Sequence, residues 1–327
     1  KMKKEGFNSL VPIHKLAVMG FGEVLKNIMF FFNLEKIILQ HIKDVSPDKI
    51  ILIDYPGFNL RIAKKMIRPS SCKVIYYISP QLWAWKENRI EIIKQYVDSL
   101  IVLFPFEVEW YKKRNIHVEY FGHPLVENNL SKQYLIKRKR NYNIALCPGS
   151  RQQEIKQHLP ILIKLVNKIQ KQNIKVNFEL FCADNIAPSY LEKFIKDEKV
   201  LINRNSILTS FKNIDFAIVA SGTASLECAI TLTPMVVIYK MSSFSWWITK
   251  MFIKTPFASI VNILANRPVV LELLQGDLTV SRLFTTVEEY LHNPQKMQEK
   301  QNQILNIIEP LALKNVYRQT SSYIAKY

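Results

Sequence analysis

Residues 143–151 read NIALCPGSR, and this stretch decides the fold class. Its first five residues are mostly apolar and form a run of the length of a buried strand, and Pro-Gly-Ser then supplies a tight turn. Residues 154–171 follow with apolar side chains at helical spacing. A buried strand that passes through a short turn into an amphipathic helix is the repeating step of a parallel α/β sheet.

The same step recurs along the chain. Further strands are predicted at 49–53, 73–78, 99–103, 117–121, 176–181, 216–220 and 235–239. A chain of 327 residues exceeds a usual single domain. The basic linker-like stretch at 130–142 predicts a division into an N-terminal domain, 1–135, and a C-terminal domain, 136–327.

Composition narrows the class of protein. The chain is 48% hydrophobic and 22% charged, which excludes a disordered protein. Its four cysteines are far apart without a C-x-x-C pair, so they are predicted to be buried thiols rather than a zinc site. No Asp-x-Asp, P-loop or G-x-G-x-x-G motif occurs, so we expect neither a metal nor a dinucleotide cofactor.

The chain carries a formal net charge of +18. That charge suits an anionic membrane surface, a phosphorylated substrate or a nucleic acid, although taken by itself it favours the simpler explanation of a lysine- and isoleucine-heavy codon bias. The only tight basic run is 137–140, which is typical of a solvated linker, and no RNA-binding pattern accompanies it. We therefore expect no nucleic-acid partner.

Two aromatic stripes predict contact with acyl chains or a membrane surface, with packing in a core as the plain alternative. The candidates are Phe31, Phe32, Trp246, Trp247, Met251 and Phe252. No apolar stretch is long and uncharged enough to span a membrane, and no signal peptide is predicted. The expected location is cytoplasmic and peripheral to the inner membrane.

Two strand–turn–helix junctions predict anion sites, at Gly149-Ser150-Arg151 and at Ser221-Gly222-Thr223. Free amides at a helix N-terminus attract negative charge, and an arginine adds a bidentate contact to phosphate. Each junction alone is more typical of a plain helix N-cap, and it is the combination of the two that predicts a ligand site. Glu227, one turn into the second helix, either accepts hydrogen bonds from ribose hydroxyls or only complements the helix dipole.

Asp54 directly follows the strand at 49–53, where parallel sheets present ligands. Its carboxylate is a candidate general base for an acceptor hydroxyl, and an Asx turn before Pro56 is the alternative. His123, in Gly-His-Pro, has the same two readings: a turn residue or a substrate contact.

Long motifs resemble the lipid-A-disaccharide synthases, the family-19 glycosyltransferases. They include IDYPGFN at 53–59, SPQLWAW at 79–85, PGSR at 148–151 and ASGTA at 220–224. Further matches lie at 16–20, 23–25, 104–107, 122–124, 154–155, 234–237, 262–267 and 272–275. They follow the family's order over nearly the whole chain.

The resemblance implies a GT-B fold of two Rossmann-like domains facing across a cleft. It implies an inverting, metal-independent transfer of 2,3-diacylglucosamine from UDP to 2,3-diacylglucosamine 1-phosphate, which releases UDP, in the lipid A assembly of Gram-negative bacteria. Asp54 and Arg151 are then the catalytic candidates. The implied UDP-binding residues are Gly149, Ser150, Arg151, Ser221, Gly222, Thr223, Glu227, Asn262 and Gln275. A homodimer is also an expectation of the resemblance.

The sequence departs from the family pattern at its start, because the family's first strand and Gly-Glu-x-Ser-Gly-Asp turn do not occur in it. The resemblance implies that one βαβ unit of roughly 30 or more residues is absent. An inactive remnant that binds UDP or membrane therefore stays open as an alternative. Two further alternatives also stay open: another GT-B enzyme acting on UDP-N-acetylglucosamine, and a nucleic-acid binder driven by its charge.

Overall fold

A computed structural model of the chain describes residues 5–11, 28–131, 141–172, 174–195, 200–243, 246–247 and 253–327. The helices are α3 (Ile28–Val45), α4 (Pro56–Lys65), α5 (Ile90–Tyr96), α6 (Pro105–Lys112), α7 (Gln152–Lys171), α8 (Pro188–Leu191), α9 (Ile207–Ser210), α10 (Thr223–Ile230), α12 (Ile260–Ala265), α13 (Val280–His292), α14 (Pro294–Ile308) and α15 (Val316–Lys326). The strands are β1 (Lys49–Ile53), β2 (Lys73–Tyr77), β3 (Ser99–Val102), β4 (Glu119–Tyr120), β5 (Tyr142–Cys147), β6 (Val176–Phe181), β7 (Val200–Asn203), β8 (Phe216–Ala220), β9 (Met235–Tyr239) and β10 (Leu271–Leu274). Short 3₁₀ turns are η2 (Glu87–Arg89), η3 (Phe211–Asn213), η4 (Gln275–Asp277) and η5 (Glu309–Leu311).

The described residues fall into two units. The first contains those of 1–80 and 89–101, and the second those of 81–88 and 102–327. The division between domains at residues 135 and 136 stays a prediction, since residues 132–140 lie outside the described part of the chain.

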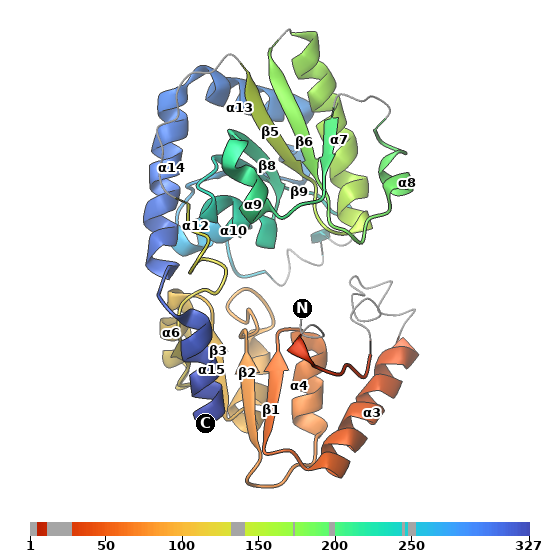
Figure 1. The fold of residues 1–327 in the computed structure, drawn as a ribbon, viewed down its shortest axis with the longest axis vertical. Helices are drawn as coiled ribbons and strands as arrows, with labels where there is room; N and C mark the ends of the chain where they lie inside the picture. Colours follow the sequence, from red (N-terminus) through yellow and green to blue (C-terminus); the bar gives the residue numbers. More distant parts are fainter. Residues whose placement is uncertain are drawn as a thin grey trace. The chain divides into compact units, whose positions relative to one another are not determined.

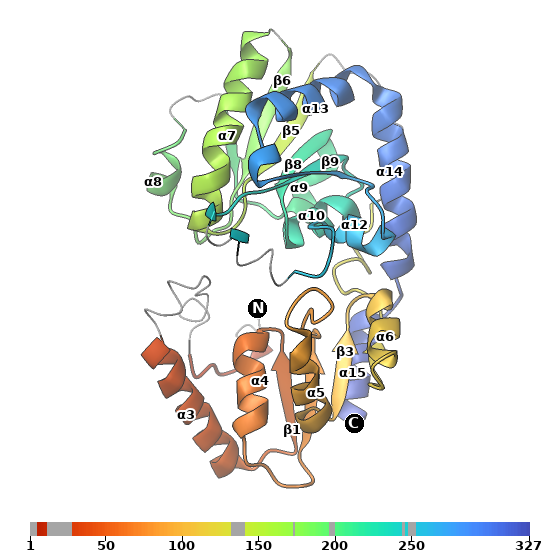
Figure 2. The same cartoon turned by 180° about the vertical axis from the view of Figure 1, so that it is seen from behind.

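The smaller sheet has the strand order β1-β2-β3-β4. Strands β1 and β2 pair in parallel with Ile51 opposite Ile75, and β2 pairs in parallel with β3. Figure 2 shows α4 and α5 in front of this sheet. The buried Val74 and Leu100 belong to its core, as expected of apolar strand runs.

The larger sheet is six-stranded with the order β10-β9-β8-β5-β6-β7, and the pairs that join its strands are parallel. Figure 1 shows α9 and α10 on one face, and Figure 2 shows α7 and α13 on the other. Helix α7 buries Ile155, Leu159, Leu162 and Val166 against the sheet at helical spacing.

The order of the larger sheet reverses beside β5. From β5 the chain continues to β6 and β7 on one side, then returns to β8 on the other side of β5 and continues outward to β9 and β10. Parallel α/β sheets bind ligands at such a switch point, beyond the carboxyl ends of the strands. The loops that follow β5 and β8 are therefore where a ligand site is expected.

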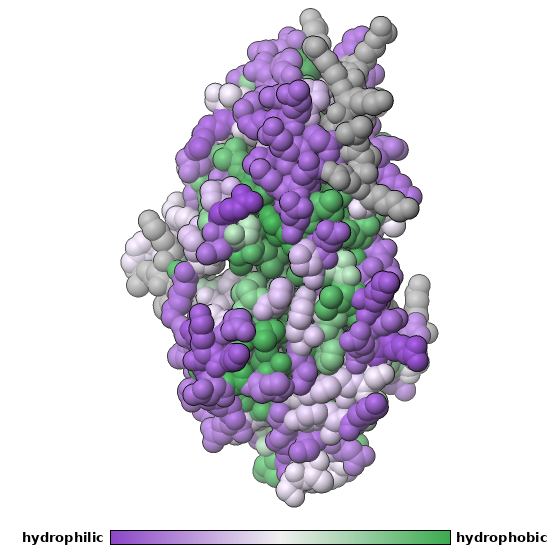
Figure 3. All heavy atoms as spheres, turned by 90° about the vertical axis from the view of Figure 1, so that its left-hand side faces the viewer, coloured by the Kyte–Doolittle hydropathy of each residue, from purple (hydrophilic) through white to green (hydrophobic). Residues whose placement is uncertain are grey.

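The described helices include none that is long and apolar enough to cross a membrane. Figure 3 shows one face of the molecule, on which hydrophilic residues predominate and hydrophobic patches lie between them. Cys72, Cys147, Cys182 and Cys228 are buried and free, which confirms the prediction of buried thiols.

Candidate functional site

A pocket of about 680 Å³ lies in the second unit at the carboxyl ends of its parallel strands. Its volume is in the usual range for a small-molecule site. It brings together both predicted turns and the predicted ribose contact: Gly149, Ser150, Arg151, Ser221, Gly222, Thr223 and Glu227. These residues meet because β5 and β8 are neighbours, with Cys147 opposite Val219.

The turn between β5 and α7 is already filled by a carboxylate of the chain. Glu154 Oε2 accepts hydrogen bonds from the backbone nitrogens of Ser150 (3.0 Å) and Arg151 (3.3 Å). Its Oε1 accepts one from Arg151 Nη1 at 3.0 Å. The prediction of free amides at this turn is therefore wrong, because a first-turn glutamate folds back and caps them.

Gly149 is required by this arrangement. It has a φ of 116°, and a Cβ placed on it would lie 2.8 Å from Glu154 Cβ. The Gly149→Ala variant should therefore lose about 1–3 kcal/mol of the free energy of unfolding, from backbone strain and steric overlap. Thermal denaturation measures this loss. Gly57→Ala is the matched control, because Gly57 lies in the first turn of α4 with open space beside it, and it should not destabilise the chain.

The turn between β8 and α10 is open to the pocket. Helix α10 begins with Gly222 as its N-cap, with a φ of 139° and no side chain that could cap the helix. A Cβ on Gly222 would meet nothing within 4 Å. The first amides of a helix have no partner within it, and the residues at the start of α10, Gly222, Thr223 and Ala224, line the pocket. This turn fits an anion such as a phosphate.

A buried histidine connects the pocket's first turn to the end of β9. His158 Nδ1 lies 2.6 Å from the carbonyl oxygen of Pro148, and its Nε2 accepts a hydrogen bond from the Lys240 amide at 2.8 Å. Burial lowers the pKa of His158, which keeps the ring neutral with one donor and one acceptor nitrogen. The β5–α7 turn and the residue after β9 are thereby held together.

Asn262, predicted to contact UDP, does not line the pocket. It is 1% exposed. Its Oδ1 accepts from the backbone nitrogens of Val269 (2.8 Å) and Val270 (2.9 Å), and its Nδ2 donates to Glu272 Oε1 at 2.7 Å. The Glu272 carboxylate also accepts from the Ala258 nitrogen, and the Ala258 carbonyl accepts from Ser221 Oγ at 2.7 Å. The structure thus gives Asn262 a supporting position behind the Ser221 turn.

The Asn262→Ala variant should lose about 2–4 kcal/mol of stability, because two buried amides lose their partner and the Glu272 carboxylate loses one of its donors. Chemical denaturation with urea measures the difference. Asn302→Ala, on an exposed position of α14, should change stability by about 0.5 kcal/mol or less. Equal stabilities for the two variants would contradict the supporting role of Asn262.

Gln275, also predicted to contact UDP, is likewise not among the pocket residues. It has a φ of 51°. Its side-chain oxygen accepts a hydrogen bond from the Met241 backbone nitrogen at 3.3 Å, and its side-chain nitrogen donates one to the Met241 carbonyl at 3.2 Å. Its contact with UDP stays a prediction.

The predicted base Asp54 lies on an unusual turn of the first unit. Asp54 and Tyr55 both have left-handed backbones, with φ of 45° and 46°. The Asp54 carbonyl accepts hydrogen bonds from Tyr76 Oη and Asn59 Nδ2, each at 2.7 Å. The side chain itself is exposed at the end of β1. A strained turn of this kind, held by its neighbours, is typical of functional positions.

The aromatic candidates have different surroundings. Phe31 is 6% exposed and packs on Tyr55 and Phe58, so it belongs to the core of the first unit. Phe32 is 41% exposed, and the Arg61 guanidinium lies over its ring. Trp247 is 63% exposed and Trp246 is half-buried, whereas Met251 and Phe252 lie outside the described residues.

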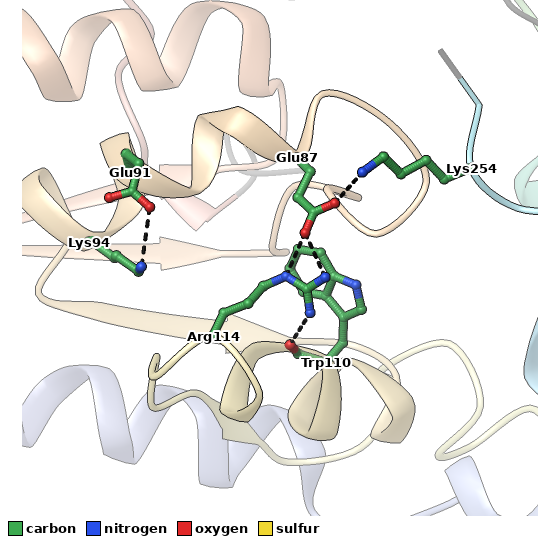
Figure 4. Close-up of polar contacts among 6 residues, drawn as sticks. All are labelled: Glu87, Glu91, Lys94, Trp110, Arg114 and Lys254. Carbon is green, nitrogen blue, oxygen red and sulfur yellow. Dashed lines mark hydrogen bonds and ion pairs between the residues drawn. The ribbon is translucent and has the colours of Figure 1, made fainter. Parts of the chain in front are cut away.

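The second aromatic stripe is followed by an anchored residue, Lys254. Its ammonium pairs with the carboxylate of Glu87, which also accepts two hydrogen bonds from Arg114 at 2.8 and 2.6 Å (Figure 4). These hydrogen bonds hold the pKa of Glu87 below its ordinary value. The backbone nitrogen of Lys254 also donates a hydrogen bond to the Ala84 carbonyl at 2.8 Å. Lys254 is thus tied to the 81–88 segment and belongs to an ion cluster with Glu87 and Arg114.

The pocket also has lining residues that the sequence did not predict, among them Glu154, Cys182, Arg204 and Tyr239. Cys182 and Arg204 directly follow β6 and β7, and Arg204 donates to the Ile186 carbonyl at 3.0 Å. A position directly after a strand is the sequence signal that could identify Cys182 and Arg204 as ligand contacts. For Arg204 this signal is missing, because the sequence does not predict the strand β7.

Comparisons with known proteins agree on one family. The sequence model of the lipid-A-disaccharide synthetases matches residues 1–326. Lipid-A-disaccharide synthase 1 of Legionella pneumophila (strain Lens) is 35% identical over 320 residues, which are 95% of this chain and 83% of that protein. The lipid-A-disaccharide synthase of Coxiella burnetii (strain RSA 331) is 36% identical over 302 residues, 90% and 79% of the two chains.

Solved structures share the fold at low identity. The UDP-GlcNAc 2-epimerase of Neisseria meningitidis, bound to UDP-GlcNAc, has a TM-score of 0.61 at 10% identity and covers 95% of this chain and 83% of its own. The UDP-GlcNAc 2-epimerase of Methanocaldococcus jannaschii has a TM-score of 0.52 at 14% identity, with coverage of 82% and 78%. Together with the two parallel sheets, these likenesses confirm the predicted α/β fold of the GT-B type.

Proposed function

The chain belongs to the lipid-A-disaccharide synthase family of glycosyltransferases in lipid A biosynthesis, and from this premise we propose its reaction. It transfers 2,3-diacylglucosamine from UDP to 2,3-diacylglucosamine 1-phosphate, with inversion of the anomeric centre and release of UDP. The observation that carries the proposal is the pocket at the switch point of the larger sheet, with the first residues of α10, Arg151 and Glu227 on its wall.

The pocket residues suit the diphosphate and the ribose of UDP. The open N-terminus of α10 takes the diphosphate, and the Arg151 guanidinium adds a charged donor. The Glu227 carboxylate accepts hydrogen bonds from the ribose hydroxyls. As the bond between the anomeric carbon and the phosphate oxygen breaks, its electron pair stays on UDP, where these donors stabilise the added negative charge.

Asp54 supplies the base in this scheme. Its exposed carboxylate takes the proton of the acceptor hydroxyl while that oxygen forms the new bond to the anomeric carbon. The aromatic residues Phe32 and Trp247, both exposed, are proposed to contact acyl chains or the membrane surface, and a homodimer is part of the proposal.

The test is the identity of donor and product. The chain, in detergent with the diacyl monophosphate acceptor, is supplied with either UDP-2,3-diacylglucosamine or UDP-N-acetylglucosamine. The proposal expects a disaccharide from the diacylated donor alone, with an anomeric configuration opposite to the donor's by nuclear magnetic resonance. Turnover of UDP-N-acetylglucosamine, or a retained configuration, would overturn it.

A further inference from the structure

Glu154 places a negative charge in the wall of a pocket proposed to bind an anion. Its side chain is 13% exposed, whereas that of its partner Arg151 is 50% exposed. One carboxylate therefore engages two backbone amides and one guanidinium, which are the groups that a phosphate would use at this turn.

The carboxylate is held in this place by the shape of the turn. Gly149 leaves the space that Glu154 fills, and a side chain at position 149 would overlap it. The two backbone bonds to Oε2 fix the carboxylate even when the half-exposed guanidinium moves. The Arg151 side chain is half exposed, so it has room to turn from the carboxylate to another anion.

We propose that Glu154 is a built-in competitor of the UDP diphosphate for Arg151, which limits the affinity for UDP and favours its release after transfer. This inference rests on the proposed function of the pocket. In the ligand-free chain the Glu154 carboxylate neutralises the Arg151 guanidinium. A diphosphate must take the place of this carboxylate at the guanidinium, and it then lies beside the negative charge of Glu154. Two like charges that share one cation weaken each other's binding.

A purely supporting role for Glu154 makes the opposite prediction. If the carboxylate only shaped the turn and aimed Arg151, its loss would weaken the binding of UDP. The sign of the change in UDP affinity therefore decides between competition and support.

The test is the Glu154→Gln variant, whose amide oxygen can still accept from the two backbone nitrogens while the charge is gone. Calorimetric titration with UDP should give a dissociation constant about tenfold lower than that of the parent chain, since a charge-assisted contact of Arg151 no longer has to be exchanged. Titration with uridine, which has no phosphate, should give the same constant for both chains. UDP should also become a stronger product inhibitor of the variant.

Glu289→Gln is the matched control. Glu289 is an exposed carboxylate on α13 that pairs with Lys296 and does not line the pocket, so removing its charge should change UDP affinity much less than Glu154→Gln does. Glu154→Ala serves as a second variant and must change UDP affinity in the same direction.

The outcomes distinguish the competition by Glu154 from the proposed binding of UDP in the pocket. Unchanged or weaker UDP binding by the Glu154 variants would overturn the competition, as would equal effects on UDP and uridine, or loss of the fold in both variants. Absence of UDP binding by the parent chain would instead overturn the proposed function of the pocket.

Discussion

Replacing Asp54 by asparagine is expected to lower the rate of disaccharide formation about 10²–10⁴-fold and to leave the affinity for UDP unchanged. The rate falls because an amide cannot take the proton of the acceptor hydroxyl. The fold should persist, because asparagine tolerates the left-handed backbone of this turn as well as aspartate does. UDP affinity should persist because every lining residue of the pocket belongs to the second unit. Initial rates and calorimetric titration measure the two quantities.

Asp48→Asn is the matched control for this variant. Asp48 is also an exposed carboxylate of the first unit and directly precedes β1, whereas Asp54 directly follows it. Its replacement should leave the rate within about a factor of two, as for a surface change away from the reaction. Similar rates for Asp54→Asn and Asp48→Asn would refute the assignment of Asp54 as the base.

Replacing Arg151 by alanine is expected to lower kcat about 10²–10³-fold. The guanidinium is proposed to meet the charge that develops on the leaving diphosphate, so its removal should act on the transition state more than on the bound donor. Arg151→Lys should recover only part of the rate, because an ammonium lacks the planar fork that binds phosphate oxygens in pairs. Steady-state kinetics with the diacylated donor separate kcat from KM.

Arg318→Ala removes the same charge from an exposed position on α15 and should leave kcat unchanged. A rise in KM with an unaltered kcat for Arg151→Ala would show that Arg151 only holds the donor, which contradicts its role at the leaving group.

Much of the fold follows from short apolar runs. The predicted strands at 49–53, 176–181, 216–220 and 235–239 coincide with β1, β6, β8 and β9. These strands are rich in β-branched or aromatic residues, and β8 and β9 are buried almost throughout, which makes a continuous apolar run a reliable signal.

The two strands at the edges of the larger sheet, β7 and β10, were not predicted. Each has four residues, and Leu201 and Leu271 are 64% and 40% exposed. Strand β7 reads VLIN and β10 reads LELL, and four residues are too few to show a period that distinguishes a strand from other short apolar runs. Pairing with a neighbour, which the sequence does not show, makes these segments strands.

The candidate site was predictable where it depends on backbone turns. Gly149 and Gly222 mark the two junctions because only glycine tolerates their φ values of 116° and 139°. The side chains of Glu154 and Asn262 were not predictable in the same way. Their partners are amides of turns whose shape arises only in the folded chain, so helical spacing placed Glu154 on α7 without showing that it folds back.

We propose that this chain transfers a lipid-bearing sugar from UDP to a second sugar. UDP release from UDP-2,3-diacylglucosamine in detergent, measured with and without the diacyl monophosphate acceptor, tests this reaction directly. Release should require the acceptor and should fall about 10²–10⁴-fold in Asp54→Asn. Release at the same rate without acceptor, or no release by a chain that binds UDP, would contradict it.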